Sequence, residues 1–64
     1  MFKLSLKAAR VNAGLTQKEV AKLLKVSNKT VHSWESGITS PSAKYVDALC
    51  EIYKLQYDDL NFFP

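Results

Sequence analysis

The sequence predicts an all-α protein, a single compact bundle of five short helices that spans residues 1–64. Apolar residues recur three and four positions apart along the chain, as they do on one face of a helix. Helix-capping residues precede these stretches, and glycine or proline separates several of them. No run alternates apolar and polar residues in the manner of a half-buried strand. These patterns favour helices alone over a sheet-based domain.

The first two helices have readable ends. We expect the first to run from about the fourth or fifth residue to Ala13, with Gly14 in the left-handed position after its last turn. Thr16 is a preferred N-cap for the second helix, and Glu19 three positions later completes a capping box. The apolar pattern of this helix ends near Leu24. Both helices are therefore short, with about two turns each.

The third helix has two faces of opposite character. Ser27 is its expected N-cap, and Gly37 stops it after Ser36. Val31 and Trp34 share an apolar face. The other face is wholly polar and consists of Asn28, Lys29, His32, Ser33 and Ser36. One side of this helix is thus expected in the core and the other in solvent.

The C-terminal half holds the last two helices. Ser40 followed by Pro41 reads as an N-cap with proline at the first helical position, so we expect the fourth helix from there to about Tyr53. A fifth, short helix is expected between Leu55 and Leu60. Two aspartates fall in its first turn, where the helix dipole favours negative charge.

Composition excludes several classes of protein. A lone cysteine, Cys50, allows no internal disulfide and suggests no zinc site. No nucleophile, base and third group assemble, so we expect neither an enzyme nor a cofactor or metal. No segment approaches the ~20 apolar residues of a membrane span, and the N-terminus lacks the apolar stretch of a signal peptide. We therefore expect a reduced, cytoplasmic protein.

The charge is distributed unevenly. Residues 1–35 contain seven Lys or Arg and two Asp or Glu, a balance of +5, whereas residues 36–64 have a balance of −2. A basic half suits a polyanion such as nucleic acid. An ordinary solvated surface explains the same numbers equally well. Charge alone therefore leaves both interpretations open.

The link between the second and third helices is only about three residues long, Lys25 to Ser27. So short a link turns the third helix sharply across the second, which is the geometry of a helix-turn-helix. The polar face of the third helix then projects from the surface. An α-helix fits the major groove of B-DNA, where polar side chains can read base edges.

At this point the run LTQKEVAKLLKVSNKTVHSWESG resembles the helix-turn-helix core of the phage repressor and Cro-like, XRE-type DNA-binding domains. Ala21 and Val31 match small and aliphatic positions of that family. The string Trp34-Glu35-Ser36-Gly37 resembles its frequent W-E-x-G signature, and Pro41 follows at the expected distance. The resemblance covers residues 6–60 and implies a lambda-repressor-like fold.

The resemblance also implies roles for individual residues. The recognition helix would span about Ser27 to Ser36 and lie in the major groove. Residues that would face bases are Asn28, Lys29, His32 and Ser33. Residues that would face phosphates are Gln17, Lys18, Ser27, Thr30 and Thr39. Arg10 and Glu35 match positions that often pair and would brace the first helix against the third.

The implied function is sequence-specific regulation of transcription from a double-stranded DNA operator, as a phage or bacterial repressor in the nucleoid. A homodimer is expected on DNA, and a monomer in solution is compatible with it. We expect the dimer contact in the acidic half, including Leu60 or Phe62. Of Phe62 and Phe63, one is expected in the core and one partly exposed.

One position departs from the family pattern. The family usually has glycine in the turn, where this sequence has Lys25. Family geometry needs a left-handed residue there, which costs a residue with a Cβ roughly 1–2 kcal/mol. We therefore expect either a strained Lys25 or a different turn.

A second class of function uses the same fold. An antitoxin-like or adaptor module would bind protein rather than DNA, and fold alone does not separate the two. A protein-binding helix normally presents apolar anchors. The polar face of the third helix therefore favours DNA.

Overall fold

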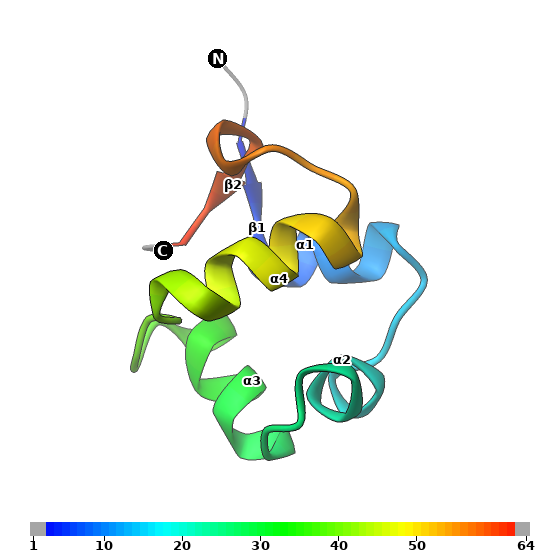
Figure 1. Ribbon diagram of the computed structural model, residues 1–64, viewed down its shortest axis with the longest axis vertical. Helices are drawn as coiled ribbons and strands as arrows, with labels where there is room; N and C mark the ends of the chain where they lie inside the picture. The colour runs from blue at the N-terminus through cyan, green and yellow to red at the C-terminus, as the bar shows by residue number, and fades with distance from the viewer. Residues whose placement is uncertain (1–2, 63–64) are drawn as a thin grey trace.

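The computed structural model describes residues 3–62 and consists mainly of four α-helices (Figure 1). The helices surround one core, with α2 and α3 at one end of the molecule and the segments that form β1, η1 and β2 at the other. Described in chain order, the elements are β1 (Leu4–Ser5), α1 (Leu6–Asn12), α2 (Gln17–Leu24), α3 (Asn28–Ser36), α4 (Ala43–Tyr53), a 3₁₀ turn η1 (Tyr57–Asp59) and β2 (Leu60–Asn61).

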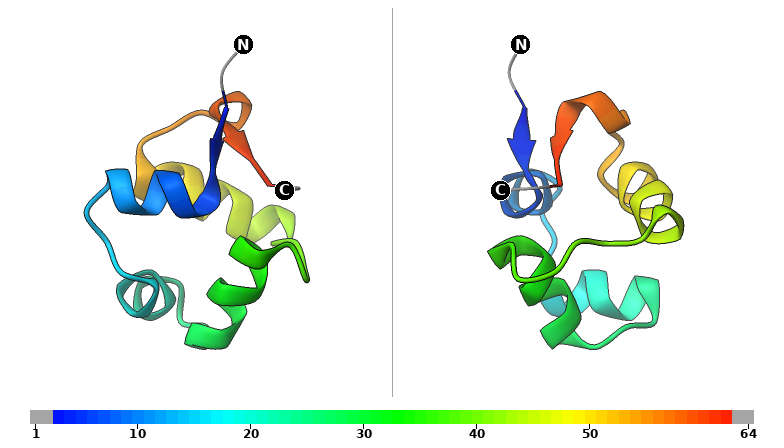
Figure 2. Two further views of the ribbon diagram at one scale, coloured as in Figure 1. Left: turned by 180° about the vertical axis from the view of Figure 1, so that it is seen from behind. Right: turned by 90° about the vertical axis from the view of Figure 1, so that its left-hand side faces the viewer.

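The prediction of five α-helices and no strand is wrong at the two ends of the chain. The expected fifth helix is a single 3₁₀ turn, because too few residues separate Gln56 from Leu60 for repeated α-type hydrogen bonds. Leu60 then enters a two-stranded parallel sheet opposite Leu4 (Figure 2). Strands of two residues are too short to show alternation, so the pattern of the sequence could not reveal them.

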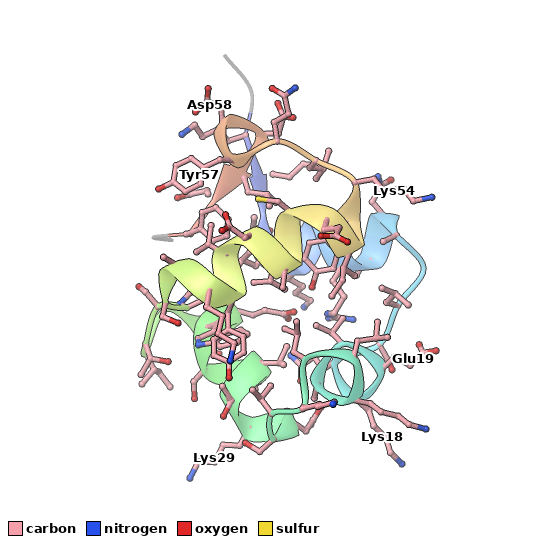
Figure 3. The ribbon with its side chains drawn as sticks, in the orientation of Figure 1. Lys18, Glu19, Lys29, Lys54, Tyr57 and Asp58 are labelled. Carbon is pink, nitrogen blue, oxygen red and sulfur yellow. The ribbon has the colours of Figure 1, made fainter. Side chains whose placement is uncertain are left out.

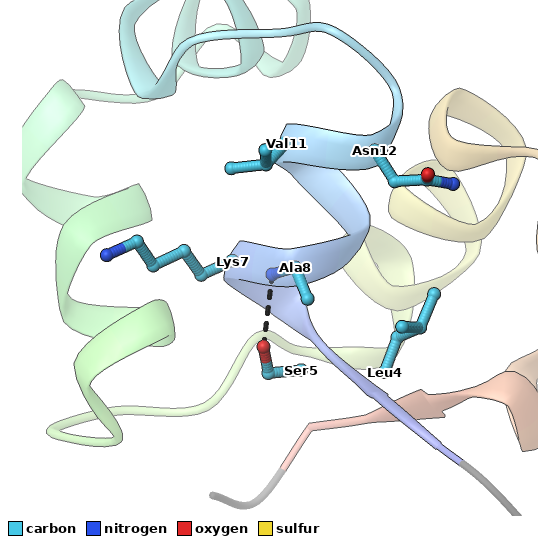
Figure 4. Close-up of a pocket in the computed structure, with 6 residues that line it drawn as sticks. All are labelled: Leu4, Ser5, Lys7, Ala8, Val11 and Asn12. Atoms are coloured by element: carbon cyan, nitrogen blue, oxygen red, sulfur yellow. Dashed lines mark hydrogen bonds between the residues drawn. The ribbon is translucent and has the colours of Figure 1, made fainter.

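The predicted starts of the second and third helices are confirmed, whereas the first helix begins at Leu6, after Leu4 and Ser5 have formed β1. The Oγ atom of Ser5 accepts a hydrogen bond from the amide of Ala8 at 3.0 Å and so caps α1 (Figure 4). Thr16 and Glu19 form the expected capping box at the start of α2. Ser27 caps α3 through the amide of Thr30. Local side-chain chemistry therefore determines where these helices begin.

The predicted start of α4 is two residues too early. Ser42, rather than Ser40, occupies the N-cap position, and the helix begins at Ala43. Pro41 is buried in an extended stretch before the helix. Two serines flank this proline, and its fixed φ suits either arrangement, so only the burial of Pro41 decides between them.

Four helices end in the same way. In each, the amide of the residue after a left-handed residue donates to a carbonyl five residues earlier, as in a Schellman motif. These bonds join Leu15 to Arg10, Val26 to Ala21, Ile38 to Ser33, and Leu55 to Cys50. The left-handed residue is glycine at two of these ends, Gly14 and Gly37. It is lysine at the other two, Lys25 with φ 59° and Lys54 with φ 56°.

The core draws on all four α-helices and on the C-terminal segment that contains β2. Its buried apolar residues are Leu6, Ala9, Val20, Ala21, Val31, Trp34, Leu49, Tyr53, Leu60 and Phe62. The ring of Trp34 on α3 lies against that of Tyr45 on α4, with centroids 5.3 Å apart. This contact confirms Trp34 as a core residue between the two helices.

Burial also corrects the expected dimer contact. Leu60 is 1% exposed and Phe62 is 3% exposed, so neither side chain is available to a second copy. Phe62 instead stacks on Tyr57 at 5.3 Å. Phe62 is therefore the expected core member of the aromatic pair, and Phe63 lies outside the described residues.

The turn between α2 and α3 generates a testable prediction. Replacing Lys25 by glycine removes a left-handed strain of ~1–2 kcal/mol but adds freedom of ~0.5–1 kcal/mol to the unfolded chain. We expect Lys25→Gly to raise the free energy of unfolding by about 0.5 kcal/mol in urea titrations followed by circular dichroism. The control Lys22→Gly, inside α2, should lower it by about 1 kcal/mol. Equal destabilisation by both variants would show that Lys25 is not strained.

Candidate nucleic-acid interface

The outer face of α3 is polar and exposed. Asn28, Lys29 and His32 are exposed and Ser33 is partly so, whereas Val31 and Trp34 on the inner face are 2% and 4% exposed. Lys29 projects from the end of the molecule where α2 and α3 meet (Figure 3). The core contacts therefore hold α3 so that the four residues predicted to face bases share one open surface.

The predicted base-facing residues differ in whether a hydrogen bond within the protein holds their side chains. The Nε2 atom of His32 lies 3.3 Å from the hydroxyl of Ser36 one turn later. No hydrogen bond joins the side chain of Asn28 or Lys29 to any other part of residues 3–62. These two side chains are therefore available to an incoming ligand.

The residues predicted to face phosphates lie at the starts of α2 and α3 and in the loop after α3. The hydroxyls of Ser27 and Thr30 lie 2.8 Å apart at the start of α3. Lys18 is exposed near the start of α2, and Thr39 is exposed in the loop after α3. These residues and Gln17 come from two helix starts and one loop.

A buried ion pair between α1 and α3 lies next to the start of α2. The Nε atom of Arg10 donates to Oε2 of Glu35 at 2.8 Å, and the two side chains are 12% and 5% exposed. The Nη2 atom of Arg10 donates to Oε1 at 3.3 Å. The two residues predicted to brace the first helix against the third therefore lie in direct contact.

The same pair reaches α2 through two further bonds, which sequence reasoning missed. The Nη1 atom of Arg10 donates to the carbonyl of Leu15 at 2.9 Å. The Nε2 atom of Gln17 donates to Oε1 of Glu35 at 3.0 Å. Gln17 is 18 positions from Glu35 in the chain, and no motif of the sequence signals their contact.

The surroundings of the ion pair are poorly hydrated. Burial, reinforced by the negative charge of Glu35, raises the pKa of Tyr53 to about 12, and Arg10 opposes this shift.

Burial also raises the pKa of the Cys50 thiol, as do Asp47 and Asp59. The thiol is therefore kept protonated and is a weak nucleophile.

Charged side chains lie at both ends of the molecule. Lys18 and Lys29 project at the end that α2 and α3 form, where Glu19 also lies, whereas Asp58 and Lys54 lie away from that end (Figure 3). Within residues 3–62 the Arg10–Glu35 contact is the only ion pair, so the lysines of α2 and α3 are not neutralised by neighbouring carboxylates. The end of the molecule that presents α3 is therefore the one that suits an anionic ligand.

Other kinds of site find little support. A shallow hollow lies over α1 and β1, is lined by Leu4, Ser5, Lys7, Ala8, Val11 and Asn12, and contains none of the predicted site residues (Figure 4). In the described part of the chain, no group of three His, Cys, Asp or Glu could hold a metal ion. None of the helices in that part is long and apolar enough to cross a membrane.

Comparisons with known proteins agree with this geometry. The helix-turn-helix family model matches residues 6–60. The chain is 29% identical over 56 residues to a protein of Streptococcus pneumoniae serotype 4 (strain ATCC BAA-334 / TIGR4) named Antitoxin PezA, a match that covers 88% of this chain. The chain spans about a third (35%) of the length of that relative. No solved structure matches the chain significantly.

The buried pair generates a second prediction. Glu35→Ala strands the Arg10 guanidinium in a poorly hydrated site, so we expect a loss of ~3–5 kcal/mol in the free energy of unfolding. Thermal and urea unfolding measure this loss. The control Glu51→Ala removes an exposed carboxylate from α4 and should change stability by less than ~0.5 kcal/mol. A Glu35→Ala protein that melts like the parent would contradict a structural role for the pair.

Proposed function

Because this chain belongs to the XRE-type, Cro-like helix-turn-helix family of DNA-binding transcription regulators, we propose that it binds a specific double-stranded operator and represses transcription there. One observation carries the proposal: α3 presents a continuous polar face at the end of the molecule where lysines lack acidic partners. An α-helix with such a face fits the major groove of B-DNA. Phage or bacterial DNA in the nucleoid is the proposed target.

We assign base reading to Asn28, Lys29, His32 and Ser33. A long cationic side chain such as that of Lys29 can donate to O6 and N7 of guanine, and an asparagine can pair with adenine. Both side chains are exposed and unbonded within residues 3–62. The hydroxyl of Ser33 and the ring of His32 add shorter donors and acceptors next to them.

We assign phosphate contacts to Gln17, Lys18, Ser27, Thr30 and Thr39. Such contacts set the register of a protein on the duplex without reading sequence. The start of α2 suits this role because the first amides of a helix lack intrahelical acceptors and attract anions. The amide side chain of Gln17 and the ammonium of Lys18 lie at that same helix start.

We further propose that two copies occupy the operator together, because one short domain offers few base contacts. Because Leu60 and Phe62 are buried, the contact between the two copies would use exposed residues of the acidic half. One of these is Tyr57, which is 56% exposed. The protein alone is compatible with a monomer. Two copies related by a two-fold axis would place equivalent half-sites one helical turn apart.

A second candidate function is an antitoxin-like adaptor that binds a protein partner. The similarity to a protein named Antitoxin PezA favours it, although the match covers only 35% of that relative. A protein-binding α3 would be expected to present apolar anchors. Its exposed side chains are polar, so DNA binding remains the preferred function.

Base reading and phosphate gripping can be separated by mutation. We expect Lys29→Ala to weaken the preferred duplex by ~1–3 kcal/mol and to relax the preference at one base position. Gln17→Ala should weaken all duplexes similarly. The matched control Lys54→Ala removes the lysine at the C-cap of α4 and should change binding little. Fluorescence anisotropy with matched and mismatched duplexes at two salt concentrations measures these effects.

Two results would contradict the assignment. An unchanged base preference in Lys29→Ala, with the salt slope reduced by about one, would make Lys29 a phosphate contact. Unchanged affinity in both Lys29→Ala and Gln17→Ala would remove α3 from the interface and favour the adaptor function.

The proposed pairing on DNA has its own test. Hydroxyl-radical footprinting on a duplex selected by the protein should show two protected half-sites ~34 Å apart. The two half-sites should fill together as protein is added, because the copies contact one another. A single isolated half-site at saturation would contradict cooperation between two copies.

A further inference from the structure

We propose that Glu35, neutralised by Arg10, is a positioning residue for DNA binding: it holds the amide of Gln17 in the orientation that leaves one N–H free for a phosphate. This inference rests on the proposed DNA-binding function and goes beyond the bracing of α1 against α3. The buried pair then affects the affinity for DNA through one side chain, that of Gln17.

The carboxylate of Glu35 is shared between Arg10 and Gln17. Its Oε2 atom accepts from Nε of Arg10 at 2.8 Å, and its Oε1 atom accepts from Nη2 of Arg10 at 3.3 Å and from Nε2 of Gln17 at 3.0 Å. An ionised carboxylate only accepts hydrogen bonds, so it selects the NH₂ end of the amide. One N–H of Gln17 is then bound to Glu35, and the second N–H remains as a donor.

The backbone beside Gln17 is held by the same pair. Nη1 of Arg10 donates to the carbonyl of Leu15 at 2.9 Å, and the amide of Leu15 donates to the carbonyl of Arg10 at 3.1 Å. Leu15 directly precedes Thr16, the N-cap of α2. Arg10 thus holds the backbone just before α2, while Glu35 holds the first side chain of α2.

Charge explains why both partners are needed. A phosphate is anionic, and an unpaired carboxylate behind Gln17 would repel it. Arg10 cancels that charge at 2.8 Å, in a site where the side chains are 12% and 5% exposed and water screens little. The Gln17 donor is therefore backed by a neutral pair. The side chain of Gln17 is ordered when the protein folds, not when it binds DNA. Ordering a flexible side chain on binding would instead reduce the affinity.

A double-mutant cycle tests the proposal. The wild type, Glu35→Gln, Gln17→Ala and the double variant are titrated into one fluorescent duplex that the wild type selects from a randomised library. Circular dichroism confirms that each is folded at the temperature used. We expect Glu35→Gln to weaken binding about three- to tenfold when Gln17 is present and to cause no further weakening when it is alanine.

The matched control is Glu51→Gln, which makes the same charge change at an exposed position of α4. It should leave affinity unchanged in both backgrounds. Equal weakening by Glu35→Gln with and without Gln17 would overturn the positioning role, because a general structural effect does not depend on Gln17. A wild-type protein that selects no duplex would instead contradict the proposed function itself.

A measurement on the wild type does not depend on how any variant folds. The chain has two glutamines, Gln17 and the exposed Gln56. In nuclear magnetic resonance spectra without DNA, one side-chain N–H of Gln17 should be shifted and protected from solvent exchange relative to those of Gln56. If the two glutamine side chains exchange alike, Gln17 is not held by Glu35 and the proposal fails.

Discussion

The bonds of the Glu35 carboxylate are the interaction on which the rest of the structure depends. Through Arg10 they connect α3 to α1 and to the loop before α2, and through Gln17 they reach the first residue of α2. A buried charge is tolerated only when it is paired and hydrogen-bonded. The helices around Glu35 are therefore constrained to the positions that complete these bonds.

A buried ion pair adds less to stability than its short distance suggests, because both charges lose their hydration. Its effect here is to select one arrangement of α1, α2 and α3. Tyr53, which is 6% exposed, lies in the same poorly hydrated surroundings. Apolar contacts such as that between Trp34 and Tyr45 fill the space around the helices. The Arg10–Glu35 ion pair determines how the polar face of α3 is presented.

The helix ends show how far local chemistry reaches. All four helices close with the same backbone bond, but the left-handed residue is glycine twice and lysine twice. A glycine in that position is visible in the sequence, whereas Lys54 resembles any surface lysine. Lys25 could be anticipated only because the resemblance to a family showed that the turn needs a left-handed residue. The fold accepts both strained lysines because core contacts on either side hold the helices in place.

The sequence by itself determined the four α-helices, the caps of α2 and α3, the short turn and the two faces of α3, because these depend on residues within about five positions of one another. The Arg10–Glu35 pair was anticipated only through the resemblance. The tertiary structure alone decided the bond between Gln17 and Glu35, the pairing of Leu4 with Leu60, and the start of α4 at Ala43. Those features join residues far apart in the chain or depend on what is buried beside them. No local pattern encodes them, because they form only when the core brings distant segments together.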